Sequence, residues 1–392
     1  MVRELLIDVY LLFYKIFFSI NNLFPLKNKI IFIITFEENA IFLYKEILKQ
    51  KIDVQIVFLC NTSILSTIKE NCPDAKISPL NTLNIFSWLI SVYNIATSKV
   101  ILVDNYFAFL STMNFKRGVT CIQLWHAAGA LKKFGLQDKK NERRSKRAIK
   151  RFQKVYSKFD RIIVGSKKME KIFNESFEIP FSKMLRTGIP RTDFFFDENL
   201  IHKTRMELKS KISELGEKKV IMYAPTFRSN ELKNQKVELD IKMLYENLKD
   251  DFIILLKFHP LVQNQYEFNY SNFIYNMSDH KNINELLLVT DYLITDYSSI
   301  PFEYSLLKKP MIFFVYDYTY YKNHQGIVDS YKQIIPGPIA KNTEEVLNCI
   351  LSMPIENKDV TKFSEEWNQY STGKSSKNLA TYIRNQLNNN KK

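Results

Sequence analysis

The chain has 392 residues, which is long for one hydrophobic core, so we expect two domains of roughly 150 to 200 residues each. Hydrophobic residues make up 46% of the chain and charged residues 25%, a globular composition that excludes low-complexity and fixed-period repeat architectures. The 56 lysines and arginines exceed the 41 acidic residues by 15, which indicates an anionic partner: nucleic acid, anionic lipid or a phosphorylated substrate. Four scattered cysteines without a CxxC pair are typical of a reducing compartment and give no structural zinc site.

The N-terminal segment, residues 1–26, predicts an amphipathic helix. Four charged residues interrupt it and no small-residue cleavage site follows, which excludes a secretory signal and a membrane-spanning helix. We expect the helix to lie on a membrane surface, with packing on the protein as the alternative, and the protein to be peripheral at the cytoplasmic face of the cell membrane. The apolar residues recur three and four positions apart: Leu5, Val9, Leu12, Phe13, Ile16, Phe17 and Ile20.

After Pro25, short apolar runs alternate with longer amphipathic stretches. Such runs predict strands of parallel sheets covered by helices on both faces. We therefore expect an α/β fold of two doubly wound, Rossmann-like domains facing a cleft, at residues 27–188 and 189–350, and C-terminal helices (351–392) that return to the first domain. The runs lie at 30–36, 54–60, 100–103, 119–125 and 161–165, and then at 220–224, 252–258, 273–275, 292–295 and 311–316.

Four predicted strand ends carry polar or charged side chains. Ligands of doubly wound sheets bind beyond the carboxyl ends of strands, so these positions are candidate site residues. The first end is Trp125-His126 in "LWHAAGALKKFG", and the second, "YAPTFRS", holds Thr226 and Arg228. The third, "LLKFHP", holds Lys257 and His259. The fourth, "LITDYSSIPFEY", holds Thr295, Asp296, Ser298, Ser299 and Glu303.

The fourth strand end predicts an anion site. Pro301 marks the first turn of a helix, where free amides and the hydroxyls of Ser298 and Ser299 suit a phosphate, although ordinary helix capping explains the serines equally well. Glu303, in the same first turn, either interacts favourably with the helix dipole or binds the ribose hydroxyls of a nucleotide. His126 and His259 fall one in each domain, and histidine serves either as a general base or as a charged donor to phosphate.

Several motifs are missing from the chain. It has neither GxxxxGK[ST] nor GxGxxG, which argues against a P-loop ATPase and a classical dinucleotide enzyme, and it has no DxD for a metal-dependent nucleotide-sugar site. Residues 132–154 hold eleven lysines and arginines and two acids but no aromatic-interleaved RNA-binding pattern. The residues alone thus predict a two-domain α/β enzyme that binds an anionic nucleotide ligand without an obvious metal.

The four strand ends together resemble the CDP-glycerol glycerophosphotransferases of wall teichoic acid synthesis in Gram-positive bacteria, most of all their primase type. The similar stretches follow the family's order from about residue 27 to 345. They are "LWHAAGALKKFG", "RTGIPRTDFF", "VIMYAPTFR", "ILLKFHP", "LLLVTDYLITDYSSIPFEYSLLKKPMIFFVYDYTYY" and "PGPI". The chain departs from the family at "TFR", where many members have T-W-R, and at "KFHP", where many have R-x-H.

The resemblance implies a GT-B-type fold and transfer of sn-glycerol 3-phosphate from CDP-glycerol to ManNAc-GlcNAc-diphospho-undecaprenol, releasing CMP, with no cofactor and no nucleic acid. Its two functional histidines fall on His126 and His259, and its donor-site turn on Thr295, Asp296, Ser298 and Ser299. Thr226, Arg228, Lys257 and Glu303 would join the donor site, and Trp125, Gly129, Lys132 and Lys133 would face the acceptor or an anionic membrane surface.

Three alternatives stay open at this point. They are a glycerol- or ribitol-phosphate polymerase or second-unit transferase of the same family, a GT-B glycosyltransferase that uses a nucleotide sugar, and a non-catalytic nucleic-acid or membrane binder. Homo-oligomerisation is open as well.

Overall fold

The computed structural model describes residues 2–80, 84–228, 237–258, 270–354 and 357–389. The chain divides into two compact units. The first unit contains Met1–Ala127, Phe134–Asp193 and Gln369–Lys392, and the second contains Ala128–Lys133 and Phe194–Asn368. These boundaries differ from the predicted ones at residues 128–133 and 351–368, which belong to the second unit, and at residues 189–193, which belong to the first.

A seven-stranded parallel sheet forms the centre of the first unit. Its order is β3-β2-β1-β4-β5-β6-β7, so strand order reverses between β1 and β4. Buried apolar side chains fill the central strands, as the near-continuous apolar runs predict. The strands are β1 (Lys27–Ile34), β2 (Gln55–Cys60), β3 (Lys76–Pro79), β4 (Ser98–Val103), β5 (Thr120–Gln123), β6 (Arg161–Ile163) and β7 (Met184–Leu185).

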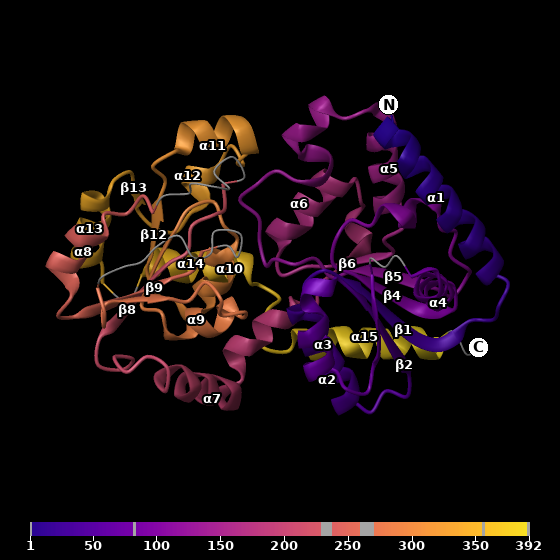
Figure 1. Cartoon of the computed structure of the whole chain (residues 1–392), viewed down its shortest axis with the longest axis horizontal. Coiled ribbons are helices and arrows are strands. Elements are labelled where there is room, and N and C mark those ends of the chain that lie inside the picture. Colours follow the sequence, from indigo (N-terminus) through magenta and orange to yellow (C-terminus); the bar gives the residue numbers. More distant parts are fainter. Residues whose placement is uncertain (1, 81–83, 229–236, 259–269, 355–356, 390–392) are drawn as a thin grey trace. The chain divides into compact units, whose positions relative to one another are not determined.

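Helices cover both faces of this sheet. Figure 1 shows α2 and α15 on one face and α5 and α6 on the other. The carboxylate of Asp193 accepts the backbone N–H groups of Ser375 and Ser376 at 2.9 and 2.8 Å, which fixes the start of α15. The helices are α1 (Val2–Asn21), α2 (Glu38–Lys49), α3 (Leu65–Asn71), α4 (Ile85–Ala96), α5 (Lys146–Ser157), α6 (Lys167–Phe177) and α15 (Ser375–Asn389).

The second unit repeats this topology with six parallel strands. Their order is β10-β9-β8-β11-β12-β13, and the reversal lies between β8 and β11. The strands are β8 (Lys219–Tyr223), β9 (Phe252–Leu256), β10 (Ile274–Asn276), β11 (Tyr292–Thr295), β12 (Met311–Phe314) and β13 (Ile339–Ala340). The helices are α7 (Glu198–Lys209), α8 (Ile241–Leu248), α9 (Ile283–Val289), α10 (Ile300–Tyr304), α11 (Tyr318–Gln325), α12 (Tyr331–Ile334), α13 (Thr343–Ser352) and α14 (Lys358–Trp367). The predicted pair of doubly wound α/β units is confirmed.

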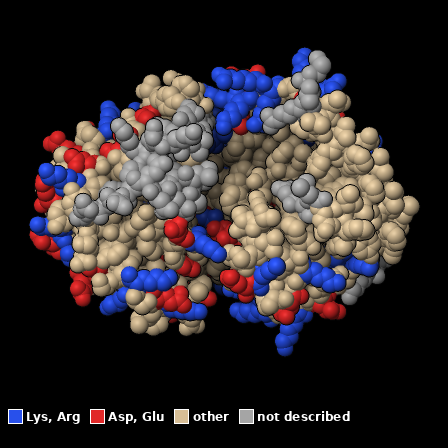
Figure 2. Space-filling model, in the orientation of Figure 1, with Lys and Arg blue, Asp and Glu red and all other residues tan. Residues whose placement is uncertain are grey.

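The predicted N-terminal amphipathic helix is confirmed as α1. Leu11, Tyr14 and Phe18 are buried on the first unit, where the Tyr14 ring stacks on Phe109 at 4.8 Å. Among the described side chains of α1, eight large hydrophobic ones are exposed: Leu5, Leu6, Val9, Tyr10, Leu12, Phe13, Ile16 and Ile20. Figure 2 shows mostly uncharged side chains along this helix. Among the described residues, no helix is both long and apolar enough to cross a bilayer.

Candidate functional site

The chain turns sharply at Trp125, just beyond the end of β5. Trp125 has a φ of 56°, the left-handed region that bulky side chains rarely occupy. Its backbone is held on both sides: its N–H donates to Gln123 Oε1 at 2.9 Å, and its carbonyl accepts from Asn39 Nδ2 at 2.9 Å. A strained backbone conformation of this kind costs about 1–3 kcal/mol and is typical of functional sites.

His126 follows this turn and lies among aromatic rings. Its imidazole stacks on Phe36 with ring centres 4.8 Å apart and on Trp125 at 4.4 Å. Its Nδ1 lies 3.3 Å from the carbonyl oxygen of Asp104. Burial lowers the pKa of His126 below its ordinary value of 6.5, although the contact with the Asp104 carbonyl opposes this shift. The imidazole is therefore neutral near pH 7, as a general base must be.

Three polar residues around His126 are absent from the predicted site. Asn39 Oδ1 accepts the N–H of Arg191 at 3.0 Å, and the Arg191 guanidinium donates to the carbonyl of His126 at 3.0 Å. Asp104 follows β4, at the point where strand order reverses, and is 2% exposed. Its position directly after an apolar run is the signal that could have identified it, because the same rule selects Asp296. Asn39 and Arg191 carry no comparable sequence signal.

Arg228 is buried at the carboxyl edge of the second sheet and is neutralised by protein carboxylates. Its Nη1 lies 2.8 Å from Asp296, and its Nε and Nη2 lie 2.9 and 3.1 Å from the two oxygens of Asp317. Burial opposes the charge, but the two carboxylates raise the pKa of Arg228 above its ordinary value. The rings of Tyr297, Tyr316 and Tyr321 surround the guanidinium. These contacts indicate that Arg228 holds the loops in place. They favour this structural role above the predicted contact of Arg228 with a diphosphate.

Asp296 and Thr295 join the ends of β8 and β11. Asp296 Oδ1 accepts the N–H groups of Thr226 and Tyr297 at 2.9 and 2.6 Å, and buried Thr295 donates its hydroxyl to the carbonyl of Ala224 at 2.7 Å. The hydroxyl of Thr226 is buried and has no hydrogen-bond partner among the described residues. Of these three predicted donor residues, Thr226 is the one whose side-chain oxygen has no hydrogen-bond partner among the described residues.

Ser298 and Ser299 precede α10, and the predicted helix start at Pro301 is confirmed. The hydroxyl of Ser298 accepts the N–H of Ile300 at 3.2 Å, whereas Ser299 makes no capping bond through its side chain. Because α10 has only five residues, its dipole is weak, and an anion here would be bound mainly by the two part-exposed hydroxyls.

Glu303 and its neighbour Phe302 contact Ala128 and Gly129 inside the second unit. Glu303 is fully buried, and its Oε1 accepts the N–H of Ala128 at 3.2 Å. A Cβ added to Gly129 would lie 2.3 Å from the ring of Phe302. Gly129 is therefore small because Phe302 packs on it. The structure thus gives Gly129 and Glu303 packing roles within the unit, and their contacts with a ligand stay predictions.

Lys132 and Lys133 are predicted on the acceptor or membrane side, but their contacts lie within the second unit. Lys133 Nζ pairs with Asp329 at 2.8 Å, and its backbone N–H donates to the carbonyl of Gly326 at 2.9 Å. The Lys132 ammonium lies 5.4 Å from the centre of the Tyr321 ring, which also contacts Arg228. The segment 128–133, which follows His126, is thus part of the second unit.

Lys257 directly follows β9 and bonds to the loop after β10. Its ammonium donates to the carbonyl oxygens of Ser278 and His280, both at 2.7 Å, and burial lowers its pKa. His259, the second predicted catalytic histidine, lies outside the described residues. In the part of the chain that the structure describes, no three histidines, cysteines or carboxylates come together as a metal site.

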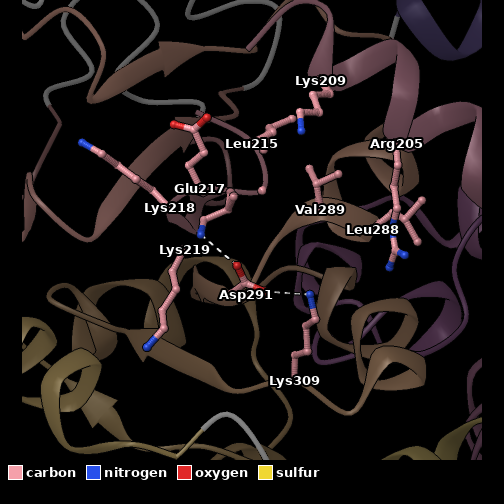
Figure 3. A pocket seen from close by; sticks show the side chains of 12 residues that line it. Arg205, Lys209, Leu215, Glu217, Lys218, Lys219, Leu288, Val289, Asp291 and Lys309 are labelled. Atoms are coloured by element: carbon pink, nitrogen blue, oxygen red, sulfur yellow. Dashed lines mark hydrogen bonds and ion pairs between the residues drawn. The ribbon is translucent and has the colours of Figure 1, made fainter. Parts of the chain in front are cut away.

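Two cavities lie at opposite edges of the second sheet. One of about 500 Å³ lies beyond the carboxyl end of β12 and is lined by Tyr316, Asp317 and Tyr318, next to the Arg228 cluster. The other, about 460 Å³, lies at the amino ends of β8, β11 and β12, where Lys309 pairs with Asp291 at 2.9 Å (Figure 3). Since ligands of doubly wound sheets bind at the carboxyl edge, the first cavity belongs with the candidate site.

The chain is similar to known proteins over its full length. Residues 16–385 match the family described as CDP-glycerol:poly(glycerophosphate) glycerophosphotransferase. The teichoic acid glycerol-phosphate primase of Bacillus subtilis (strain 168) is 39% identical over 98% of this chain and 99% of its own length. The primase of the same name from Bacillus spizizenii is 35% identical over 97% and 98%.

The fold is similar to a solved structure of the wall teichoic acid polymerase TagF. The TM-score is 0.82 at 23% identity, over 100% of this chain and 98% of that one, which confirms the predicted GT-B-like fold class. The strand ends on which the site was predicted lie within the matched residues. The chain therefore belongs to the CDP-glycerol:poly(glycerophosphate) glycerophosphotransferase family.

Proposed function

We propose that the protein transfers sn-glycerol 3-phosphate from CDP-glycerol to ManNAc-GlcNAc-diphospho-undecaprenol and releases CMP, as the priming step of wall teichoic acid synthesis. The observation that carries this proposal is the setting of His126, a half-buried neutral imidazole behind a strained turn at the carboxyl edge of a doubly wound sheet. The 39% and 35% identity to two glycerol-phosphate primases favours priming over polymerisation.

His126 acts as the general base. A hydroxyl of the disaccharide gives its proton to Nε2, its oxygen forms a bond to the glycerol-bearing phosphorus, and the bond from that phosphorus to the CMP oxygen breaks. The electron pair leaves with CMP. In phosphoryl transfer most of the rate comes from positioning and charge stabilisation, and a well-placed base adds about 10²–10⁴-fold.

The second unit binds the donor nucleotide. In this proposal the part-exposed hydroxyls of Ser298 and Ser299 contact phosphate oxygens, together with the Thr226 hydroxyl, which has no partner among the described residues. The cavity beside Tyr316 and Tyr318 has the size and aromatic lining of a nucleoside site. His259 and Lys257 complete the donor side in this proposal. Arg228 acts indirectly, because it holds the loops that carry these groups.

The first unit binds the cytoplasmic face of the membrane through α1 and α5. Ion pairs join the two helices, from Arg147 to Asp8 at 3.7 Å and from Arg151 to Glu4 at 3.3 Å. A groove between α1 and α5 runs beside the apolar face of α1. Three exposed lysines line it: Lys15, Lys150 and Lys154. Apolar side chains flanked by cations suit an anionic bilayer surface, where each cation contributes about 1 kcal/mol.

The test combines the protein with CDP-glycerol and a soluble analogue of the disaccharide-diphosphate lipid, and measures CMP and product mass. We expect one glycerol phosphate added per acceptor. Addition of many units would indicate a polymerase, and absence of CMP release would contradict the proposal. A parallel thermal-shift series with CDP-glycerol, CDP-ribitol and UDP-sugars distinguishes the remaining alternatives: stabilisation by a UDP-sugar alone would indicate a glycosyltransferase.

A further inference from the structure

Asp104 supports His126 in two ways: directly through its backbone carbonyl, and indirectly through its side chain and Phe36. The carbonyl oxygen of Asp104 lies 3.3 Å from His126 Nδ1. The side chain of Asp104 holds the loop after β1, because its Oδ2 accepts the N–H groups of Thr35 and Phe36, both at 2.7 Å. Phe36 in turn stacks on the imidazole, with the ring planes 22° apart.

We propose that Asp104 is the positioning residue of His126, and that it selects the proton-bearing nitrogen of the imidazole as well as the orientation of the ring. This inference rests on the proposed function, in which His126 is the base.

The carbonyl contact determines the tautomer. A carbonyl oxygen can only accept a hydrogen bond, so Nδ1 of a neutral His126 must carry the proton. The lone pair is then on Nε2, which is the nitrogen that takes the proton of the acceptor hydroxyl. With the opposite tautomer, Nε2 would already carry a proton and the ring could not act as a base at that atom.

The side-chain contact determines where the ring lies. Phe36 is 42% exposed and has little packing of its own to hold it, so its position depends on the backbone of the β1–α2 loop. That backbone is fixed by the bonds to Asp104 and by Asn105, whose amide donates to the hydroxyl of Thr35 at 3.2 Å. Loss of the Asp104 carboxyl group would release the loop and remove the aromatic support from one side of the imidazole.

Four variants separate positioning from general stability. Asp104→Ala removes the carboxylate that accepts the N–H groups of Thr35 and Phe36. Asp104→Asn keeps an oxygen for these two N–H groups and offers its amide to the hydroxyl of Thr35. Phe36→Leu removes only the stacking. Asp160→Ala is the matched control, because Asp160 also accepts a backbone N–H in the first sheet, from Cys121 at 2.8 Å, but at the amino edge before β6.

The first readout is the ¹⁵N spectrum of histidine-labelled full-length protein, with the His126 signals identified by their loss in His126→Gln. We expect the Nδ1–H tautomer in the wild type, in Asp104→Asn and in Asp160→Ala. Asp104→Ala keeps the backbone carbonyl but releases the loop that carries Phe36, so the imidazole can move away from that carbonyl and we expect a mixture of tautomers. An Nε2–H tautomer in the wild type overturns the inference whether or not the protein transfers glycerol phosphate.

The second readout is the split between kcat and KM for CDP-glycerol. A displacement of a catalytic group by about 1 Å can cost about 10²-fold, so we expect kcat to fall about 10²-fold in Asp104→Ala and about tenfold in Phe36→Leu, with KM changed less than about twofold. Asp104→Asn and Asp160→Ala should keep kcat within about threefold. Equal losses in Asp104→Ala and Asp160→Ala would overturn the inference. If Asp104→Ala does not fold, an unchanged kcat in Phe36→Leu overturns it.

Failure of this inference is distinguishable from failure of the proposed function. A wild-type protein that makes no CMP contradicts the function, while the tautomer remains measurable. If transfer requires His126 but is unaffected by Asp104→Ala and Phe36→Leu, the proposed function holds and the positioning role of Asp104 is wrong.

Discussion

In each unit an aspartate stands directly after the strand that follows the reversal of strand order: Asp104 after β4 and Asp296 after β11. Each aspartate accepts two backbone N–H groups and fixes the loop that follows the neighbouring strand. This loop begins near Thr35 in the first unit and near Thr226 in the second. Both aspartates are buried. The two sheets therefore use the same polar connection at the edge where doubly wound sheets bind ligands.

The two aspartates differ in what balances their charge. Asp296 pairs with Arg228, whereas within the described part of the chain no lysine or arginine pairs with Asp104. Burial therefore raises the pKa of Asp104 to about 7, against the opposing effect of its hydrogen bonds. The first unit thus has a titratable group beside the imidazole of His126, and the second has a fixed ion-pair cluster beside the cavity lined by Tyr316 and Tyr318.

The largest effect on stability should come from breaking the cluster of the second unit. Arg228→Leu leaves the carboxylates of Asp296 and Asp317 buried without a cation, which should lower the free energy of unfolding by about 3–5 kcal/mol. Denaturant unfolding measures this loss. As a control, Lys242→Met removes an exposed helix pair with Glu246 and should change the free energy by less than about 0.5 kcal/mol. A loss below about 1 kcal/mol for Arg228→Leu would show that the cluster is not structural.

The pH dependence of stability should separate the two aspartates. The folded pKa of Asp104 lies above the unfolded value of 3.8, so the native state binds its proton more tightly. This stabilisation is full below pH 4 and is lost as the pH rises through about 7. Relative to Asp104→Asn, the wild type should lose about 1–3 kcal/mol of unfolding free energy between pH 5 and pH 7. Urea denaturation at several pH values measures the difference, and a flat difference would refute the raised pKa.

The contact between Gly129 and Phe302 should be sensitive to one methyl group. Gly129→Ala places a Cβ 2.3 Å from the ring, so we expect a loss of about 1–3 kcal/mol in unfolding free energy. Adding Phe302→Leu should recover part of that loss, since the smaller side chain leaves room. A double-mutant cycle by thermal or denaturant unfolding measures the coupling, and strictly additive losses would contradict the packing described here.

The smallest effect concerns the surfaces of the two units. Lys150→Gln removes one exposed cation beside α1 and should weaken binding to anionic vesicles by about 1 kcal/mol, roughly fivefold. Lys203→Gln, on an exposed helix of the second unit, should leave vesicle binding unchanged. Sedimentation with phosphatidylglycerol vesicles measures both variants. Equal weakening by the two changes would show that binding follows net charge and not the α1–α5 surface.

Much of the fold follows from local sequence pattern. The apolar runs around Ile31 and Ile294 predict buried parallel strands, because residues covered on both faces lose the polar alternation of exposed strands. Pro301 predicts a helix start for a similarly local reason. His126 and Asp296 could be identified because they stand directly after such strands.

The partners of the site residues could not be predicted in this way. Lys133 pairs with Asp329 and Gly129 packs on Phe302, at separations of 196 and 173 residues that no periodicity encodes. The charge on Arg228 suggests a phosphate contact until its pairing with Asp317 is known. Asp104 is different, because the rule that selects Asp296 applies to it equally.

The most direct measurement of the central claim is a single-turnover comparison of CMP release by the wild type and by His126→Ala, each with CDP-glycerol and the lipid-linked disaccharide. We expect one CMP per glycerol phosphate transferred in the wild type. The variant should be slower by about 10²–10⁴-fold and bind CDP-glycerol with unchanged affinity. Transfer by His126→Ala at a near wild-type rate would contradict the assignment of His126 as the base.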